Sequence, residues 1–352
     1  MTSFATCLIA WQKQYGRHHL PWQQTQDPYR IWISEIMLQQ TQVETVKAYY
    51  ERFLKQFPNV KALATASFDE VVALWSGLGY YARARNLHKA ANDIVTLHDG
   101  HFPKDPDQLE RLAGIGRSTA AAIAAFAFGT RTTILDGNVK RILSRYFAIS
   151  DEIDSAKTTR QLWQIAEQLL PDTNINAYIQ GLMDLGSLVC KRNRPLCQIC
   201  PVSNDCEANL AGNPQSYPVR KKAREKPEKA AIFLILYDEK KRILLKKRPP
   251  KGIWGGLWCF PDIGIDTKTS MNRMLEMASD ALSVSTSQLT FLPAIKHVFT
   301  HFKLHIYPVT CQLNSAKYNL TDGRQHWFES TELNQLGFPK PVFDLLKQMC
   351  HN

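Results

Sequence analysis

The spacing of apolar residues is helical along the first part of the chain. Helix start signals precede several apolar runs. Ser67 and Glu70 form a capping box ahead of VVALW, and Asp105 caps a turn whose first helical residue is Pro106. These patterns predict a helical domain that extends to about residue 212.

The pattern changes after a proline-containing and basic segment. Residues 213–229, NPQSYPVRKKAREKPEK, contain three prolines and six Lys or Arg, and Val219 is their only large aliphatic residue. This composition predicts a linker. Beyond it, AAIFLILY, RILLKKR and KLHIYPVTCQL are strand-like, and helices are expected at 271–282 and 341–349. We therefore predict an all-α region at 1–212 and a smaller α/β domain at 230–352.

One acidic residue interrupts an apolar helical stripe. Asp27 and Pro28 predict the start of a helix through RIWISEIML, and Glu35 lies four residues after Ile31 and three before Leu38. A carboxyl group on that face is partly buried, and burial disfavours its ionised form. Glu35 is thus a candidate general acid that stays protonated near neutral pH. The alternative is an ordinary salt-bridged or boundary glutamate.

A glycine hairpin, Ala113-Gly114-Ile115-Gly116, separates two expected helices in LAGIGRSTAAAI. Glycine allows positive φ and close approach of a phosphate, and the helix that begins at Arg117 offers free N–H groups. Such a hairpin holds a nucleic-acid backbone without reading its sequence. The alternative is a tight helix–helix turn that binds nothing.

A second isolated acid follows the hairpin. Asp136 lies twenty residues after Gly116 in TTILDGNV, an apolar and strand-like run. An aspartate before glycine is usually a turn former or a helix cap. Taken alone, Asp136 therefore assigns no function.

Four of the eight cysteines are close together in the sequence. Cys190, Cys197, Cys200 and Cys206 have the spacing C-x6-C-x2-C-x5-C, and the other four are scattered. Four thiolates on one loop can hold a tetrahedral zinc ion or an iron–sulfur cluster. Zinc sites more often use two C-x2-C pairs, and only one is present, so the spacing favours iron–sulfur over zinc. The distribution indicates a metal site in a reducing compartment rather than a disulfide framework.

The net positive charge of the chain favours a polyanionic binding partner. The chain carries 43 Lys and Arg against 32 Asp and Glu, a formal net charge of +11. Lys191, Arg192 and Arg194 lie in the cysteine loop, where they could contact phosphates. The N-terminal residues lack the features of a secretory signal, and the longest nearly apolar run, 120–128, is too short to cross a bilayer. We expect a soluble intracellular protein.

Several of these motifs, in order, resemble one protein family. SEIMLQQTQVETV, WSGLGYYARARNLHKAA, LAGIGRSTAAAI, ILDGNVKRIL and the cysteine loop are similar to the iron–sulfur branch of the helix-hairpin-helix DNA glycosylases, and in detail to the MutY adenine DNA glycosylases. The resemblance is strong from Trp11 to Cys206 and looser beyond. It implies an all-α glycosylase domain with a [4Fe-4S] cluster on loop 190–206, followed by a Nudix-like domain.

The resemblance also implies an activity and a partner. The expected reaction is excision of adenine mispaired with 8-oxoguanine or guanine in double-stranded DNA, after extrusion of the base from the helix. The expected protein is a monomer in the bacterial cytoplasm. It associates with the nucleoid by binding DNA, and it binds no membrane.

Residue roles follow from the same resemblance. Glu35 gives a proton to the leaving adenine, and ionised Asp136, hydrogen bonded by Asn138, stabilises the cationic sugar. The implied DNA and base contacts are Trp22 and Gln180 in the adenine pocket, Gln40 and Tyr80 in the duplex, Thr41 and Leu78 beside the oxidised guanine, and Gly114 and Gly116 on phosphates.

One position separates this interpretation from its nearest rival, the endonuclease III type. Endonuclease III-type relatives carry a lysine where this chain has Ser118, so we expect no efficient strand cleavage. Some MutY relatives carry a tyrosine there, and Ala113 replaces a usual hairpin proline. A DNA-binding protein without enzymatic activity would need neither Glu35 nor Asp136.

The C-terminal domain has a Nudix likeness in RPPKGIWGGLWCFP. TSMNRMLEMASDALSV lacks the glutamate-rich R-E-x-x-E-E helix that binds metal, which argues against a nucleotide hydrolase. In the family this domain recognises 8-oxoguanine through an F-S-H loop, which here is Phe299, Thr300 and His301. Thr300 keeps the hydroxyl group of the usual serine.

Overall fold

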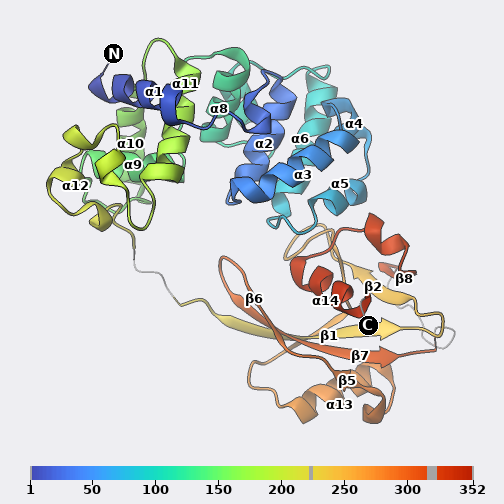
Figure 1. The fold of residues 1–352 in the computed structure, drawn as a ribbon. Helices are drawn as coiled ribbons and strands as arrows, with labels where there is room; N and C mark the ends of the chain where they lie inside the picture. The colour runs from blue at the N-terminus through green and yellow to red at the C-terminus, as the bar shows by residue number, and fades with distance from the viewer. Residues whose placement is uncertain (1, 222–224, 315–322, 351–352) are drawn as a thin grey trace. The chain divides into compact units, whose positions relative to one another are not determined.

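The computed structural model describes residues 2–221, 225–314 and 323–350. The chain forms two compact units (Figure 1). The first contains Met1–Thr65 and Asn86–Ala223, and the second contains Ala66–Arg85 and Arg224–Asn352. The segment 66–85 thus belongs to the same compact unit as the C-terminal domain, although it lies between helices of the first unit in the sequence.

The described part of the first unit is helical. Its longer helices are α1 (Ser3–Tyr15), α2 (Pro28–Leu38), α3 (Val43–Gln56), α4 (Val60–Thr65), α7 (Pro106–Glu110), α8 (Arg117–Phe128), α9 (Gly137–Tyr146), α10 (Ala156–Gln168) and α11 (Ile175–Asp184), and α6 (Ala82–Leu97) enters it from the second unit. The shorter helical segments, labelled η where they are not α-helices, are η1 (Pro21–Gln23), η2 (Leu185–Val189), η3 (Cys197–Ile199), η4 (Ser203–Asp205), α12 (Glu207–Leu210) and η5 (Pro214–Ser216).

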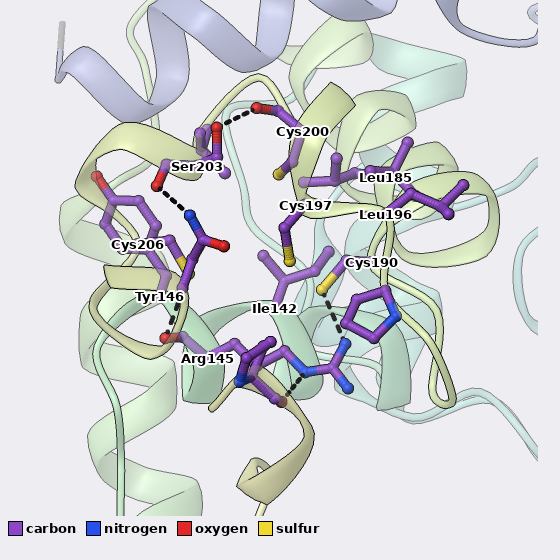
Figure 2. A pocket seen from close by; sticks show the side chains of 15 residues that line it. Ile142, Arg145, Tyr146, Leu185, Cys190, Leu196, Cys197, Cys200, Ser203 and Cys206 are labelled. Carbon is purple, nitrogen blue, oxygen red and sulfur yellow. Dashed lines mark hydrogen bonds between the residues drawn. The ribbon is translucent and has the colours of Figure 1, made fainter. Parts of the chain in front are cut away.

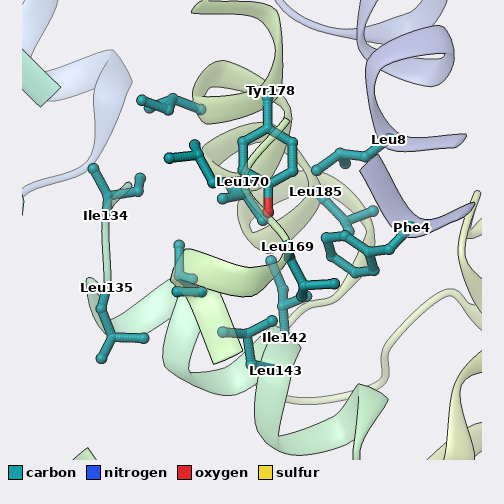
Figure 3. Packing of buried hydrophobic residues seen from close by; sticks show 14 of the residues in the cluster. Phe4, Leu8, Ile134, Leu135, Ile142, Leu143, Leu169, Leu170, Tyr178 and Leu185 are labelled. Atoms are coloured by element: carbon teal, nitrogen blue, oxygen red, sulfur yellow. The ribbon is translucent and has the colours of Figure 1, made fainter. Parts of the chain in front are cut away.

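The core of this unit forms between α1, α9 and α11. Phe4 and Leu8 from α1 pack beside Tyr178 from α11 and Ile142 from α9 (Figure 3). The buried alanines of α8 have small side chains, so α2, α7 and α11 approach it closely. The apolar side chains removed from water here stabilise the scaffold that carries the pocket described below.

The helix start signals are confirmed. Ser67 and Glu70 form the capping box of α5 (Phe68–Trp75), and the Asp105 side chain caps α7. The strand-like run TTILDGNV pairs with none of the described strands up to Asp136, and its last three residues begin α9. The Leu135 N–H donates to the hydroxyl of Ser118 at 2.9 Å, and Asp136 ends the run as the N-cap of α9.

The second unit is built on one mixed sheet. Over the residues that the structure describes, the sheet has eight strands: β1 (Glu228–Tyr237), β2 (Ile243–Lys247), β3 (Trp258–Cys259), β4 (Asp262–Ile265), β5 (Thr290–Phe291), β6 (Ile295–Val298), β7 (Lys303–Gln312) and β8 (Gln325–Phe328). The central strands β1 and β7 run parallel, with Ile232 opposite Tyr307. The expected strands in this domain are confirmed.

Helices cover both faces of this sheet. α13 (Met271–Leu282) packs Met274 and Ala278 against Ile232 and Leu234 of β1, and α14 (Lys340–Cys350) lies on the other side (Figure 1). The helices expected at 271–282 and 341–349 are confirmed, as is the fold class. Short turns are η6 (Thr286–Gln288) and η7 (Glu332–Gln335). Among the described residues, no helix is long and apolar enough to cross a membrane.

Candidate active site

A pocket of about 340 Å³ opens in the first unit. Its walls come from the segment after α1, from α2 and from α11, and they include Trp22, Glu35, Phe126 and Gln180. The structure therefore brings together three residues that the sequence proposed for adenine and its excision. Trp22 is buried and meets the Tyr50 ring edge-on at 5.4 Å, which fixes one wall.

Glu35 lies in this pocket on the apolar face of α2. Ile31, Ile36 and Met37 around it are buried. Burial raises the pKa of the Glu35 carboxyl to about 8, and the negative charge of Asp136 adds to the shift. At neutral pH Glu35 therefore holds a proton.

Asp136 is held by the first turn of α9. Its Oδ1 accepts hydrogen bonds from the N–H groups of Asn138 at 3.0 Å and Val139 at 2.8 Å, and its Oδ2 accepts one from the Asn138 amide at 3.3 Å. Burial raises the pKa of Asp136, while these hydrogen bonds and Arg141 oppose the shift. The two carboxyl groups repel when both are charged, and Asp136 has hydrogen bonds that favour its ionised form.

Arg141 connects this carboxylate to the cysteine loop. Its guanidinium donates to Asn138 Oδ1 at 2.9 Å and to the carbonyl groups of Gly186 at 2.6 Å and Cys190 at 2.8 Å. Gly186 approaches Asn138 so closely that an added Cβ would lie 2.5 Å from the Asn138 Cβ. The sequence did not single out Arg141, since its partners are 45 and 49 residues away.

The four cysteines of the loop face one small cavity. Figure 2 shows the sulfur atoms of Cys190, Cys197, Cys200 and Cys206 turned toward it. Arg145 donates to the Cys190 sulfur at 3.3 Å and to the Lys191 carbonyl at 2.7 Å. None of these four cysteines forms a disulfide with another described residue, and burial raises the pKa of Cys200 to about 12.

The sulfur positions bear on the kind of metal group. Tetrahedral zinc holds its thiolates at about 2.3 Å, which brings the sulfur atoms within about 4 Å of one another. Over the described residues, no group of three or more His, Cys, Asp or Glu side chains is placed to bind a single ion. Four cysteines around one cavity are the donor set that a [4Fe-4S] cluster takes, one on each iron.

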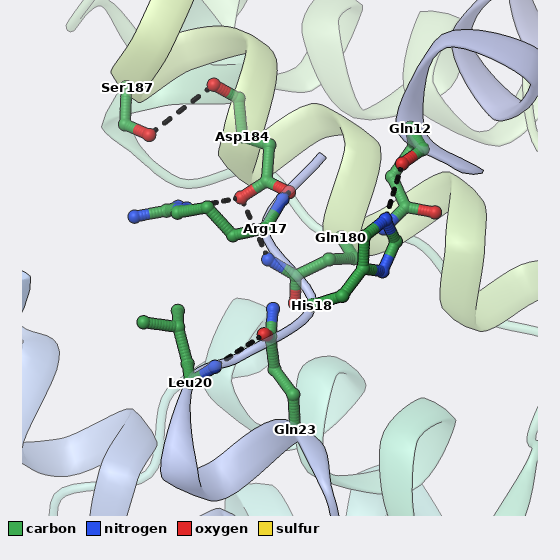
Figure 4. Close-up of polar contacts among 8 residues, drawn as sticks. All are labelled: Gln12, Arg17, His18, Leu20, Gln23, Gln180, Asp184 and Ser187. Carbon is green, nitrogen blue, oxygen red and sulfur yellow. Dashed lines mark hydrogen bonds and ion pairs between the residues drawn. The ribbon is translucent and has the colours of Figure 1, made fainter. Parts of the chain in front are cut away.

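A buried carboxylate orients part of the pocket wall. Asp184 is fully buried and accepts from Arg17 Nε at 2.6 Å, from the Arg17 N–H at 2.9 Å and from Gln180 Nε2 at 2.9 Å (Figure 4). One N–H of the Gln180 amide is used here, so its second N–H and its oxygen are the groups left for a ligand. The sequence did not identify Arg17 and Asp184. The spacing of Asp184 four residues after Gln180 on one helix was the available signal.

The hairpin has the expected form. Gly114 has φ +78°, and an added Cβ would lie 2.7 Å from the Asn86 Cβ, so only glycine fits. Gly116 is the N-cap of α8 and has open space around its Cα. Gln40 is exposed with φ 58°, and Thr41 beside it is half-buried. These residues belong to the first unit.

The remaining predicted residues lie in the second unit. Leu78 is buried, and Tyr80 is 47% exposed with φ 51°. Phe299 stacks on Phe302 with ring centroids 4.4 Å apart, at the turn between β6 and β7. The other two residues of that turn, Thr300 and His301, are exposed.

Comparisons with known proteins agree with this description. Residues 33–168 match the HhH-GPD superfamily of base excision DNA repair proteins, and residues 231–348 match the NUDIX domain. A thermostable thymine-DNA glycosylase is similar in structure at a TM-score of 0.55 and 28% identity, over 59% of this chain and 95% of that one. A DNA complex of endonuclease III shares the fold at a TM-score of 0.51 and 21% identity, over 60% and 98%. The fold and the site thus define a helix-hairpin-helix DNA glycosylase with a C-terminal Nudix-like domain.

Proteins of similar sequence identify the family within this class of DNA glycosylases. The adenine DNA glycosylase of Buchnera aphidicola subsp. Acyrthosiphon pisum is 36% identical over 352 residues, 99% of this chain and 98% of the relative. The human adenine DNA glycosylase is 33% identical, over 86% of this chain and 66% of the relative. The chain belongs to the adenine DNA glycosylase family of base excision repair, and the predicted family resemblance is confirmed.

Proposed function

We propose that this protein excises adenine from mispairs with 8-oxoguanine or guanine in double-stranded DNA, using Glu35 as general acid and Asp136 to stabilise the sugar cation. The observation that carries the proposal is the Glu35 carboxyl group in the pocket, whose pKa is raised by burial and by the charge of Asp136, a second carboxyl group that is hydrogen bonded in its ionised form. A proton on one and a charge on the other match the two needs of glycosidic cleavage.

The reaction proceeds in two stages. The Glu35 carboxyl group transfers its proton to a ring nitrogen of the extruded adenine, and the bond between that base and C1′ breaks with its electron pair on the base. The cationic sugar lies near the negative charge of Asp136, which the α9 N–H groups and the Asn138 amide hold in place. A water then adds to C1′ and gives up a proton, so that Glu35 is protonated again.

Recognition of the mispair is proposed for the exposed side chains. Tyr80 and Gln40 are exposed residues with positive φ in tight turns, as suits groups that enter a duplex. The turn of Phe299, Thr300 and His301 is proposed to contact 8-oxoguanine together with Thr41 and Leu78. Trp22 and Gln180 are proposed to hold the adenine, and the α8 hairpin at Gly114 and Gly116 to hold phosphates.

We propose that the enzyme lacks efficient strand cleavage. Cleavage of the abasic strand by a glycosylase requires an amine that forms a Schiff base with C1′. No lysine is among the residues that line the pocket. The Ser118 hydroxyl accepts the Leu135 N–H, which ties the start of α8 to the segment before Asp136.

A [4Fe-4S] cluster is proposed for Cys190, Cys197, Cys200 and Cys206. Bound there, the cluster supplies cross-links that order the loop. The same loop carries Lys191, Arg192 and Arg194, and its backbone is already fixed by Arg145. An ordered basic loop strengthens binding to phosphates.

Replacement of Asp136 by asparagine tests the enzymatic proposal against a protein that only binds DNA. Asparagine also caps helices, so α9 should persist in Asp136→Asn. We expect excision of adenine to fall about 10²- to 10³-fold while the dissociation constant for DNA stays within a few-fold. Asp151→Asn, which removes an exposed charge paired with Lys157 at 3.1 Å, is the matched control. Unchanged excision in Asp136→Asn would rule out the role of this carboxylate.

A further inference from the structure

The loop before α6 has an unusual backbone. Gly77 and Gly79 have φ 93° and 75°, and Tyr80 has φ 51°. A tyrosine rarely adopts this left-handed conformation, because its Cβ crowds the backbone there. Other groups must therefore hold the loop in place, and Tyr80 projects from it with 47% of its surface exposed.

Arg83 stabilises the backbone of the loop before α6. Its guanidinium donates to the carbonyl groups of Leu78 at 3.4 Å and Gly79 at 3.2 Å, and it lies 5.4 Å from the centres of both the Trp75 and Tyr80 rings. The Trp75 indole N–H donates to the same Gly79 carbonyl at 3.2 Å. The buried Arg83 thus fixes the two peptide groups that precede Tyr80 and contacts its ring.

The C-terminal domain holds the same loop through one peptide group. The Phe338 N–H donates to Ser76 Oγ at 3.1 Å, and the Phe338 carbonyl accepts from the hydroxyl groups of Ser76, at 3.2 Å, and Tyr81. The Tyr81 oxygen in turn accepts the Gly77 N–H at 3.3 Å. Phe338 lies between η7 and α14, so residues 262 and 257 positions apart meet at the base of the loop.

Close packing fastens the helix that leads into the loop. An added Cβ on Gly337 would lie 2.0 Å from Val72 Cγ1, so the backbone beside Phe338 touches α5 directly. Lys247 of β2 pairs with Asp69 of α5 at 2.7 Å. These contacts lie inside the second compact unit, so the loop and the sheet domain form one body.

We propose that Arg83 and the Phe338 peptide group are positioning elements that present Tyr80 as a preformed wedge, which makes the C-terminal domain a participant in opening the duplex. The inference rests on the proposed function, in which Tyr80 enters the DNA. A wedge that is already ordered spends none of the binding free energy on ordering itself. That free energy then remains available to separate stacked bases.

The test compares A:G mispairs flanked by G·C pairs with A:G mispairs flanked by A·T pairs. Stacking free energies of base-pair steps differ enough to change an unstacking equilibrium by about tenfold. In Ser76→Ala, Tyr81→Phe and Arg83→Lys, we expect the single-turnover excision rate to fall about tenfold more in the G·C context than in the A·T context. Fluorescence of 2-aminopurine beside the target should show less unstacking on binding.

The matched control is Tyr29→Phe. It removes a buried tyrosine hydroxyl that donates to the Phe57 carbonyl at 2.7 Å, the same kind of bond as Tyr81 to Phe338, in the first unit. We expect Tyr29→Phe to change both contexts equally. Equal losses in both contexts for the three loop variants would overturn the inference, since a general loss of stability has no dependence on flanking pairs.

Tyr80→Ala separates the inference from the proposed function. In one outcome, Tyr80→Ala lowers the excision rate more in the G·C context while the three loop variants do not. Tyr80 would then be a wedge that needs no positioning by Arg83 or Phe338, and only the inference would fail. If Tyr80→Ala leaves excision unchanged in both contexts, the proposed role of Tyr80 is wrong.

Discussion

At the scale of single residues, the chemistry depends on the cost of burying Glu35. In water a glutamate is ionised at pH 7, but here burial and the charge of Asp136 raise the pKa to about 8. The carboxyl group is then a proton donor at the pH at which DNA repair occurs. The same burial makes the residue unfavourable for folding, as is common for catalytic groups.

This pKa predicts a pH profile for excision. The active form of Glu35 is protonated, so the single-turnover rate should fall as pH rises through about 8, and it should fall again at acidic pH where Asp136 becomes protonated. Glu35→Gln should lower the rate about 10²- to 10⁴-fold at pH 7 and abolish the fall near pH 8. Glu44→Gln, an exposed glutamate paired with Lys47, is the control. A variant that keeps the wild-type fall in rate near pH 8 would assign the titration to another group.

The raised pKa of Glu35 also predicts that the variant Glu35→Gln is more stable than the wild type at high pH. A carboxyl group whose pKa is higher in the folded state binds more protons there, so stability falls as pH rises from about 4.5 through about 8. Glu35→Gln removes this cost and should be more stable than the wild type at pH 8 by at least about 1 kcal/mol. Thermal unfolding of both proteins at pH 5 and pH 8 measures the difference. It should be small at pH 5, and an equal difference at both pH values would contradict the assigned cause.

At the scale of elements, α9 joins the two chemical centres of the first unit. Its N-cap is Asp136, Asn138 supports that carboxylate, and Arg141 and Arg145 reach the backbone of the cysteine loop. These contacts connect the cysteine loop to the carboxylate through one helix. Most of them go to peptide carbonyls, and Arg145 also donates to the Cys190 sulfur.

Gly186→Ala tests this link. The new Cβ would lie 2.5 Å from the Asn138 Cβ, so Asn138 must shift away from Asp136 and Arg141. We expect the single-turnover rate to fall about tenfold or more with little change in the dissociation constant for DNA. Gly264→Ala, whose Cβ meets open space, is the control. A rate equal to that of the control would mean that the Asn138 position is not critical.

Gly114→Ala tests the hairpin. The alanine Cβ would clash with Asn86 at a backbone φ of +78°, so the loop must change shape. We expect affinity for DNA to fall by a similar factor for mispaired and fully paired duplexes, with a shallower dependence on salt, because phosphate contacts carry no sequence information. Titrations at several salt concentrations measure both quantities. A loss confined to mispaired DNA would contradict this assignment.

The elements that the sequence predicted correctly are those with local signals. Ser67 with Glu70 and Asp105 with Pro106 act within one helical turn, so the caps of α5 and α7 follow from short stretches. The run before Asp136 is strand-like in composition, but it pairs with none of the described strands. Its Leu135 N–H instead donates to Ser118, 17 residues earlier, a partner that the local sequence does not indicate.

The missed parts of the site depend on distant partners. Arg17 and Asp184 are 167 residues apart, and Phe338 meets Ser76 over 262. The sequence around an arginine, or around a phenylalanine peptide group, does not indicate which distant residue will contact it. These pairs could be identified only from the folded structure.

At the scale of the whole molecule, the cysteine loop adds a cofactor requirement. We expect purified protein to contain about four iron and four sulfide ions per chain, as a cluster with four cysteine ligands requires. Cys197→Ser should lower this content and weaken DNA binding, because the loop with Lys191 and Arg192 loses its order. Metal analysis and binding titrations measure the two effects. One zinc per chain and no iron would contradict the cluster.

The measurement that tests the central claim most directly is single-turnover excision on three duplexes, containing adenine opposite 8-oxoguanine, adenine opposite guanine, or an oxidised pyrimidine. Each reaction is analysed with and without alkali. The account predicts breaks at adenine that appear only after alkali, which would show excision without strand cleavage. Breaks at the oxidised pyrimidine in the absence of alkali would contradict both the proposed substrate and the lack of strand cleavage inferred from Ser118.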